Sequence, residues 1–95
     1  MFDVNKIRSD FPILSREVNG KPLVYLDNGA SAQKPKVVID AIECAYAHEY
    51  ANVHRGLHYL SNLATEKYES VREVIARFLG VRDADEIVLN TGSTM

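Results

Sequence analysis

The chain has 95 residues, of which 46% are hydrophobic and 25% are charged, and its formal net charge is −2. This size allows at most one small domain, and the apolar fraction is that of a folded protein rather than a disordered tail. The nearly balanced charge gives no reason to expect nucleic acid or an anionic membrane as a partner, and no apolar run approaches membrane-spanning length. The single cysteine excludes an internal disulfide, and the first residues carry no secretory-signal pattern, so a cytoplasmic location is expected.

The amino-terminal segment is predicted to begin with a short helix. Asp3 is a suitable N-cap, and the helix is expected to run to Arg8. Asp10 and Pro12 argue against its continuation, because the residue before a proline disfavours the helical backbone. The apolar residues 11–14 are therefore expected to form an arm that docks on another surface.

A hairpin and a polar loop are predicted next. The Asn19-Gly20 pair is a strong turn signal between extended residues 16–18 and a strand at 23–26. Residues 27–35 are small or polar, and Gly29 permits backbone conformations that other residues resist, so a ligand can come close to this loop. Taken alone, the composition of the loop favours an ordinary connection that leads into a helix starting at Pro35.

Two longer helices are predicted from the apolar periodicity. The first covers residues 35–50, and Cys44 in its interior is interpreted as a small buried hydrophobe rather than a nucleophile. The second covers residues 62–79, with Ser61 as N-cap and Gly80 as the stop, and a Glu69–Arg72 pair supports it. Short strands are predicted before and after these helices, and the expected class is α/β, or α+β for the segment in isolation.

A strand at residues 86–90 leads into Thr91-Gly92-Ser93-Thr94. In an α/β fold such a turn opens into a helix whose N–H groups attract phosphate, and the two hydroxyls would add donors. By itself the pattern is also compatible with a simple turn.

His54 and His58 are four residues apart, a spacing that places both on one face if the segment is helical. No carboxylate or cysteine lies at ligand spacing beside them, and Gly56 lies between them, so a metal site is disfavoured. Loop histidines that bond to the backbone are the simpler interpretation.

Several short motifs in this order resemble the amino-terminal part of the SufS-type cysteine desulfurases, which belong to the class V aminotransferase group of pyridoxal-phosphate enzymes. The resemblance extends from Phe2 to Thr94 and departs from the family pattern at Met95, where the family has an acidic residue. The motifs are Asp10-Phe11-Pro12, residues 14–20, Tyr25-Leu26-Asp27, residues 30–35, Val53-His54-Arg55-Gly56, Ala64-Thr65-Glu66-Lys67 and Gly92-Ser93-Thr94.

The resemblance implies a function and an assignment of residues. The segment 1–95 would comprise the amino-terminal arm, part of the small domain and the start of the cofactor domain of a fold type I enzyme. That enzyme would take sulfur from L-cysteine, leave L-alanine and an enzyme persulfide, and supply iron–sulfur cluster assembly. Ser93 and Thr94 would bind the phosphate of pyridoxal phosphate, whereas Gly29, Ala30, His54 and Arg55 would lie near the substrate.

The resemblance also implies what this segment lacks and whom it meets. The family's Schiff-base lysine and nucleophilic cysteine match no position here, so no catalytic residue is assigned and the chain alone is expected to be inactive and to bind the cofactor poorly. A homodimer and a sulfur-acceptor protein are the expected partners. Two alternatives remain open: a selenocysteine lyase or another class V enzyme, and a non-catalytic relic or interaction module.

Overall fold

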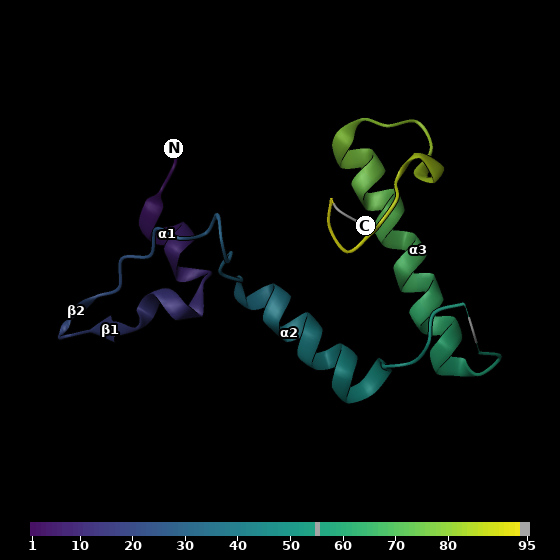
Figure 1. The fold of residues 1–95 in the computed structure, drawn as a ribbon, viewed down its shortest axis with the longest axis horizontal. Helices are drawn as coiled ribbons and strands as arrows, with labels where there is room; N and C mark the ends of the chain where they lie inside the picture. The colour runs from purple at the N-terminus through teal and green to yellow at the C-terminus, as the bar shows by residue number, and fades with distance from the viewer. Residues whose placement is uncertain (55, 94–95) are drawn as a thin grey trace. The chain divides into compact units, whose positions relative to one another are not determined.

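The computed structural model describes residues 1–54 and 56–93 (Figure 1). The chain divides into two compact units, residues 1–47 and residues 48–95, and each is described by itself. Helices and short strands are both present, which confirms the mixed α/β class predicted from the sequence.

The first unit begins with helix α1 (Val4–Ser9), followed by a 3₁₀ turn η1 (Pro12–Ser15). The side chain of Asp3 accepts a hydrogen bond from the Lys6 amide at 3.2 Å, so the predicted N-cap is confirmed. The helix ends before Pro12, as its sequence position requires. Most of the arm predicted at residues 11–14 therefore lies in a turn of 3₁₀ helix.

The hairpin is shorter than predicted. Strands β1 (Glu17–Val18) and β2 (Lys21–Pro22) pair antiparallel, with Val18 opposite Lys21. Asn19 and Gly20 connect them with φ values of 54° and 74°, the left-handed pair that a two-residue hairpin turn needs. The strand predicted at residues 23–26 is not formed. The amide of Leu23 bonds to the Arg16 carbonyl at 3.1 Å, and beyond it residues 24–26 have no strand to pair with in the part of the chain that the structure describes.

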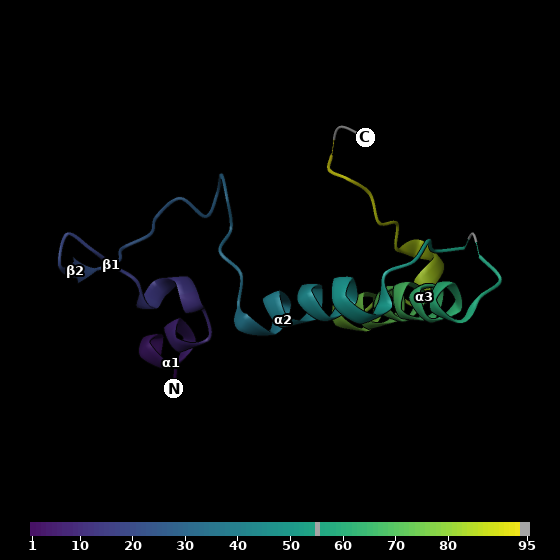
Figure 2. The ribbon, with the colours of Figure 1, turned by 90° about the horizontal axis from the view of Figure 1, so that it is seen from below.

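Between β2 and α2 the polar loop runs without helix or strand (Figure 2), and its own side chains hold it. The hydroxyl of Tyr25 donates to the Ser31 carbonyl at 2.6 Å, and the side-chain oxygen of Asn28 accepts from the Gln33 amide at 2.9 Å. These bonds replace the ladder that a strand would have supplied. The loop therefore has a defined path without regular secondary structure.

Helix α2 (Lys36–Cys44) continues into a π-helical turn, η2 (Ala45–Glu49). Pro35 has a ψ of 158° and is the N-cap rather than the first helical residue, so the predicted start was one residue early. Cys44 is exposed, and the prediction that it is buried was wrong for this chain, in which no residue of α2 is buried.

In the second unit, helix α3 spans Tyr59–Leu79 and ends at Gly80 with φ 73°, as predicted. Its N-cap is His58, however, not Ser61. The Nδ1 atom of His58 accepts the amide of Ser61, and Ser61 lies inside the first turn with 1% of its surface exposed. The predicted start was three residues late because the hydroxyl of Ser61 serves the preceding loop instead.

After α3 comes a 3₁₀ turn, η3 (Ala84–Glu86), which is capped by the side chain of Asp83. The strand predicted at residues 86–90 is absent. Strand formation requires a neighbouring strand, and within the described residues the sheet contains only β1 and β2.

Burial is sparse throughout the described chain. Ala76 is the only apolar residue there that is buried, while large apolar side chains such as Leu26 and Phe78 are 91% and 88% exposed. Residues 87–89 have the composition of a strand that is buried on both faces of a sheet, yet they are half-buried or exposed. The elements are therefore held mainly by local hydrogen bonds rather than by a packed core.

Candidate functional site

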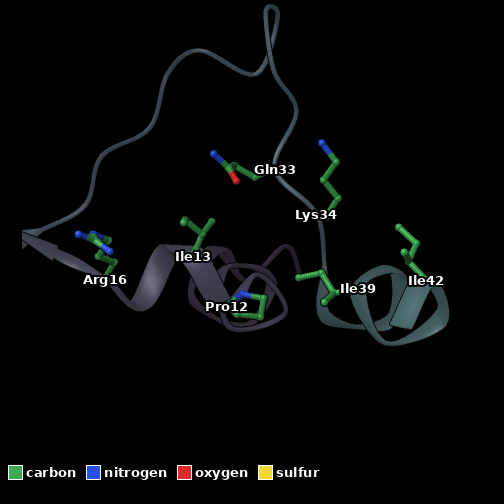
Figure 3. A pocket seen from close by; sticks show the side chains of 7 residues that line it. All are labelled: Pro12, Ile13, Arg16, Gln33, Lys34, Ile39 and Ile42. Carbon is green, nitrogen blue, oxygen red and sulfur yellow. The ribbon is translucent and has the colours of Figure 1, made fainter. Parts of the chain in front are cut away.

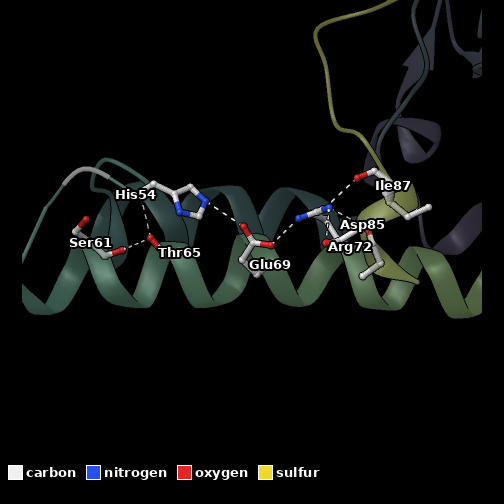
Figure 4. Close-up of polar contacts among 8 residues, drawn as sticks. His54, Ser61, Thr65, Glu69, Arg72, Asp85 and Ile87 are labelled. Atoms are coloured by element: carbon white, nitrogen blue, oxygen red, sulfur yellow. Dashed lines mark hydrogen bonds and ion pairs between the residues drawn. The ribbon is translucent and has the colours of Figure 1, made fainter. Parts of the chain in front are cut away.

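One face of α3 carries a polar stripe made of Ser61, Thr65, Glu69 and Arg72 (Figure 4). The spacing of four, four and three residues places these side chains along the same side of the helix. Each of them bonds to a segment outside α3, so the stripe determines the path of the chain before and after the helix.

Ser61 anchors the amino-terminal end of this arrangement. Its hydroxyl donates to the Asn52 carbonyl at 2.6 Å and accepts the Gly56 amide at 2.9 Å. A Cβ atom on Gly56 would lie 2.7 Å from the Cβ of Ser61 and 2.9 Å from the ring of His58. Only glycine fits at this close approach, which explains why the motif has glycine there.

His54 is held at three points by α3. Its amide donates to the Thr65 hydroxyl at 3.0 Å, its Nε2 atom lies 3.0 Å from a carboxylate oxygen of Glu69, and its ring packs edge-on against Tyr68 at 5.9 Å. The backbone of His54 has φ 62°, which is unfavourable for a non-glycine residue. These contacts offset that strain and fix the imidazole on the helix.

Arg72 holds the segment that follows the helix. Its Nε atom donates to the Ile87 carbonyl at 3.1 Å, Nη2 donates to the Ala84 carbonyl at 3.0 Å, and Nη1 bonds to Glu69 at 2.8 Å. In addition, Oδ1 of Asp85 lies 3.5 Å from Nη2 of Arg72, and the side chain of Asp85 is largely exposed. The planar fork of arginine satisfies all these acceptors at once, which the single ammonium of lysine cannot do.

The phosphate-type motif, residues 91–94, begins four positions after Ile87. Gly92 has φ 136°, and its amide bonds to the side chain of Asn90 at 3.0 Å. Ser93 is exposed. An exposed hydroxyl beside a glycine in a conformation that other residues avoid fits the donor chemistry of a phosphate site. Thr94, the second predicted phosphate ligand, lies outside the described residues.

The predicted substrate-side residues are distributed over both units. His54 lies in the second unit, on the polar stripe, and Arg55 lies outside the described residues. Gly29 and Ala30 belong to the first unit, in a turn closed by the bond from the Ala30 amide to the Asp27 carbonyl at 3.1 Å. A Cβ atom on Gly29 would have nothing within 4 Å, so this chain leaves room for a close approach there.

Sequence reasoning missed most of the polar stripe. Ser61 was interpreted as an N-cap and Glu69 with Arg72 as a pair that supports the helix; the 2.8 Å contact confirms that pair, but its wider role was not predicted. The polar residues at 61, 65, 69 and 72 recur at helical spacing beside the apolar face. That recurrence was the available signal for a face committed to holding other segments.

The first unit contains an apolar groove of about 660 Å³ that was also not predicted (Figure 3). Isoleucines from η1 and α2 form its floor, and Arg16 and Lys34 stand at its edge with their cationic groups. The lining residues are Pro12, Ile13, Arg16, Gln33, Lys34, Ile39 and Ile42.

Metal-binding and membrane-spanning features were also sought. In residues 1–54 and 56–93, no three histidine, cysteine, aspartate or glutamate side chains gather as a metal site would require. None of the helices described is both long and apolar enough to cross a membrane. His54 and His58 instead serve the backbone and α3.

The sequence of this segment is that of a class V aminotransferase. The family model described as "Aminotransferase class-V" matches residues 24–95, and the chain belongs to this family. Proteins named "Cysteine desulfurase" from Salmonella typhimurium (strain LT2) and Salmonella newport (strain SL254) are each 58% identical to it over 93 residues. That alignment covers 98% of this chain and 23% of each relative, so the chain spans about a quarter of their length.

A solved structure gives the same result for the fold. The apo structure of cysteine desulfurase from Thermococcus onnurineus NA1 superposes with a TM-score of 0.69 at 38% sequence identity. The match covers 86% of this chain and 19% of that one. The α/β fold expected from the resemblance is therefore confirmed for this segment.

Proposed function

We propose that this chain is the amino-terminal segment of a pyridoxal-phosphate-dependent cysteine desulfurase of the SufS type. The observation that carries the proposal is the 58% identity, over nearly the whole chain, to proteins named cysteine desulfurase. The reaction would convert L-cysteine to L-alanine and transfer the sulfur to an enzyme thiolate as a persulfide. Iron–sulfur cluster assembly is the proposed use of that sulfur.

The proposed cofactor supplies an electron sink for bonds at the substrate Cα and Cβ atoms. This chain's contribution would be to bind and orient. The hydroxyls of Ser93 and Thr94 would donate to the cofactor phosphate, and Gly92 would let the backbone approach it. His54 and Arg55, with Gly29 and Ala30, would line the substrate side.

The chemistry itself is assigned to residues beyond this segment. Lys36 is paired with Asp40 at 2.8 Å and Lys67 is paired with Glu49, which is typical of surface lysines rather than of a Schiff-base lysine. Cys44 is exposed on the first unit and has no assigned catalytic role. We therefore expect no turnover by the 95 residues alone. The complete enzyme is proposed to be a cytoplasmic homodimer that passes sulfur to an acceptor protein.

A chimera tests this function directly. The segment replaces the matching 93 residues of the Salmonella typhimurium relative, and L-alanine formation from L-cysteine is measured with pyridoxal phosphate present. We expect cofactor retention and catalytic formation of L-alanine from L-cysteine. A folded chimera that retains cofactor but makes no alanine contradicts the assignment.

A further inference from the structure

We propose that Glu69 is a positioning residue that couples the two candidate site segments of the second unit. One segment contains His54 and the other runs from Ala84 through Ile87 toward Ser93. The assignment of the first segment to the substrate side and of the second to the phosphate side rests on the proposed function. The coupling itself rests on the contacts within this chain.

The two carboxylate oxygens of Glu69 have different partners. Oε1 lies 3.0 Å from Nε2 of His54, and Oε2 lies 2.8 Å from Nη1 of Arg72. Arg72 uses its other two donor nitrogens on the Ala84 and Ile87 carbonyls. A single carboxylate therefore joins the loop before α3 to the segment after it, 33 residues apart at His54 and Ile87 (87 − 54).

Neither segment has a strand or a long helix to hold it. Residues 52–54 lie outside helices and strands, and residues 87–90 follow a single 3₁₀ turn. The hydrogen bonds and the ion pair described above that tie them to α3 come from the side chains of the stripe, and the ring of His54 also packs against Tyr68. Arg72 keeps 20% of its side-chain surface exposed, against 43% for Glu69 and 53% for His54, so the arginine end is the better shielded of the two.

The geometry makes the coupling specific to Glu69. Thr65 bonds only the His54 side, through the amide of His54 and the Ser61 carbonyl. Arg72 reaches only the Ile87 side and Glu69. Removal of the Glu69 carboxylate takes away the His54 Nε2 partner and the charge that orients the Arg72 fork. Both segments should therefore loosen together in this variant.

Amide hydrogen exchange on the 95-residue chain tests the coupling without any cofactor. Glu69→Ala should speed exchange at the amides of His54, Gly56 and Ile87 by about two- to fivefold, the range that a half-exposed ion pair supports. Glu66→Ala is the matched control, because Glu66 is an exposed glutamate of α3 outside the stripe. Thr65→Val should speed exchange at His54 while leaving Ile87 unchanged.

The outcomes separate coupling from general loosening. If Glu69→Ala changes only one segment, or changes neither, the proposal is overturned. If Glu66→Ala gives the same acceleration, the effect belongs to the helix as a whole and the proposal is overturned as well. Helical circular dichroism accompanies each variant, since alanine favours the helix in both glutamate substitutions.

The Salmonella chimera adds a functional measurement. Glu69→Ala should raise KM for L-cysteine and the Kd for pyridoxal phosphate by about two- to fivefold, with kcat changed by less than about twofold. A fall in kcat alone would contradict a positioning role. An inactive parent chimera would remove the proposed function, whereas the exchange results on the isolated chain would still decide the coupling.

Discussion

Replacement of Ser61 by alanine provides the sharpest test of how the loop before α3 is held. The hydroxyl is 1% exposed and has two partners, the Asn52 carbonyl at 2.6 Å and the Gly56 amide at 2.9 Å. Alanine removes both bonds without a steric clash and leaves only a very small void. The Asn52 and Gly56 groups then lose their partner in a partly buried site.

The expected cost follows from these two bonds. A polar group left unsatisfied in a buried site costs about 1–3 kcal/mol, and the partial exposure of this pair places the total in the same range. Helix propensity acts in the opposite direction, because alanine is favoured over serine inside a helix by about 0.5 kcal/mol. The net expected loss of local stability is about 0.5–2.5 kcal/mol, which corresponds to a two- to seventyfold faster local opening.

The assay is amide exchange at Gly56, whose N–H is the donor in one of the lost bonds. Ser70→Ala is the control, because Ser70 is exposed on the same helix and its hydroxyl bonds only the Lys67 carbonyl. Propensity alone predicts that both variants stabilise α3. If Ser61→Ala leaves exchange at Gly56 unchanged or slower, as the control does, the anchoring role assigned to Ser61 is wrong.

Three further substitutions test the geometry and the ion pairing of the chain. Gly56→Ala should release the loop and speed amide exchange at neighbouring residues, because the new Cβ would lie 2.7 Å from the Cβ of Ser61. Gly29→Ala should fold normally, since its new Cβ would have nothing within 4 Å. Thermal melting by circular dichroism compares the two variants. The hydrogen bond and the charge of Asp40 raise the pKa of Lys36 above its ordinary 10.5. The Lys36–Asp40 pair therefore favours folded α2 below pH 10.5, and this contribution is lost as the pH rises through the raised pKa of Lys36. Asp40→Asn should lower the Lys36 pKa in an NMR titration, and an unchanged pKa would show that the pair does not form in solution.

The sequence was informative where local chemistry alone determines the backbone. Asp3, the Asn19-Gly20 turn and Gly80 were predicted and are confirmed, because caps and left-handed turns depend on residues a few positions apart. The strands at residues 23–26 and 86–90 were wrong. Their apolar composition describes a place in a sheet, and a strand forms only when a neighbour supplies the ladder.

The candidate site was only partly predictable for a related reason. His54 was selected from its motif, but its contacts with Glu69 and Thr65 connect residues 11 to 15 positions apart. Ser61 is a good N-cap by composition, yet His58 takes that role and frees the serine hydroxyl for Asn52 and Gly56. Which of two capable side chains serves a helix end depends on the loop geometry, which residue preferences do not specify.

Among residues 1–54 and 56–93, Ala76 is the lone buried apolar side chain, and this has a consequence for the heat capacity of the chain. Unfolding raises the heat capacity in proportion to the apolar area newly exposed to water, typically about 12–15 cal/mol/K per residue in globular domains. In the described residues that area is already largely in contact with water. The isolated chain should therefore melt with a small heat-capacity change and a broad transition, and its stability should vary weakly with temperature.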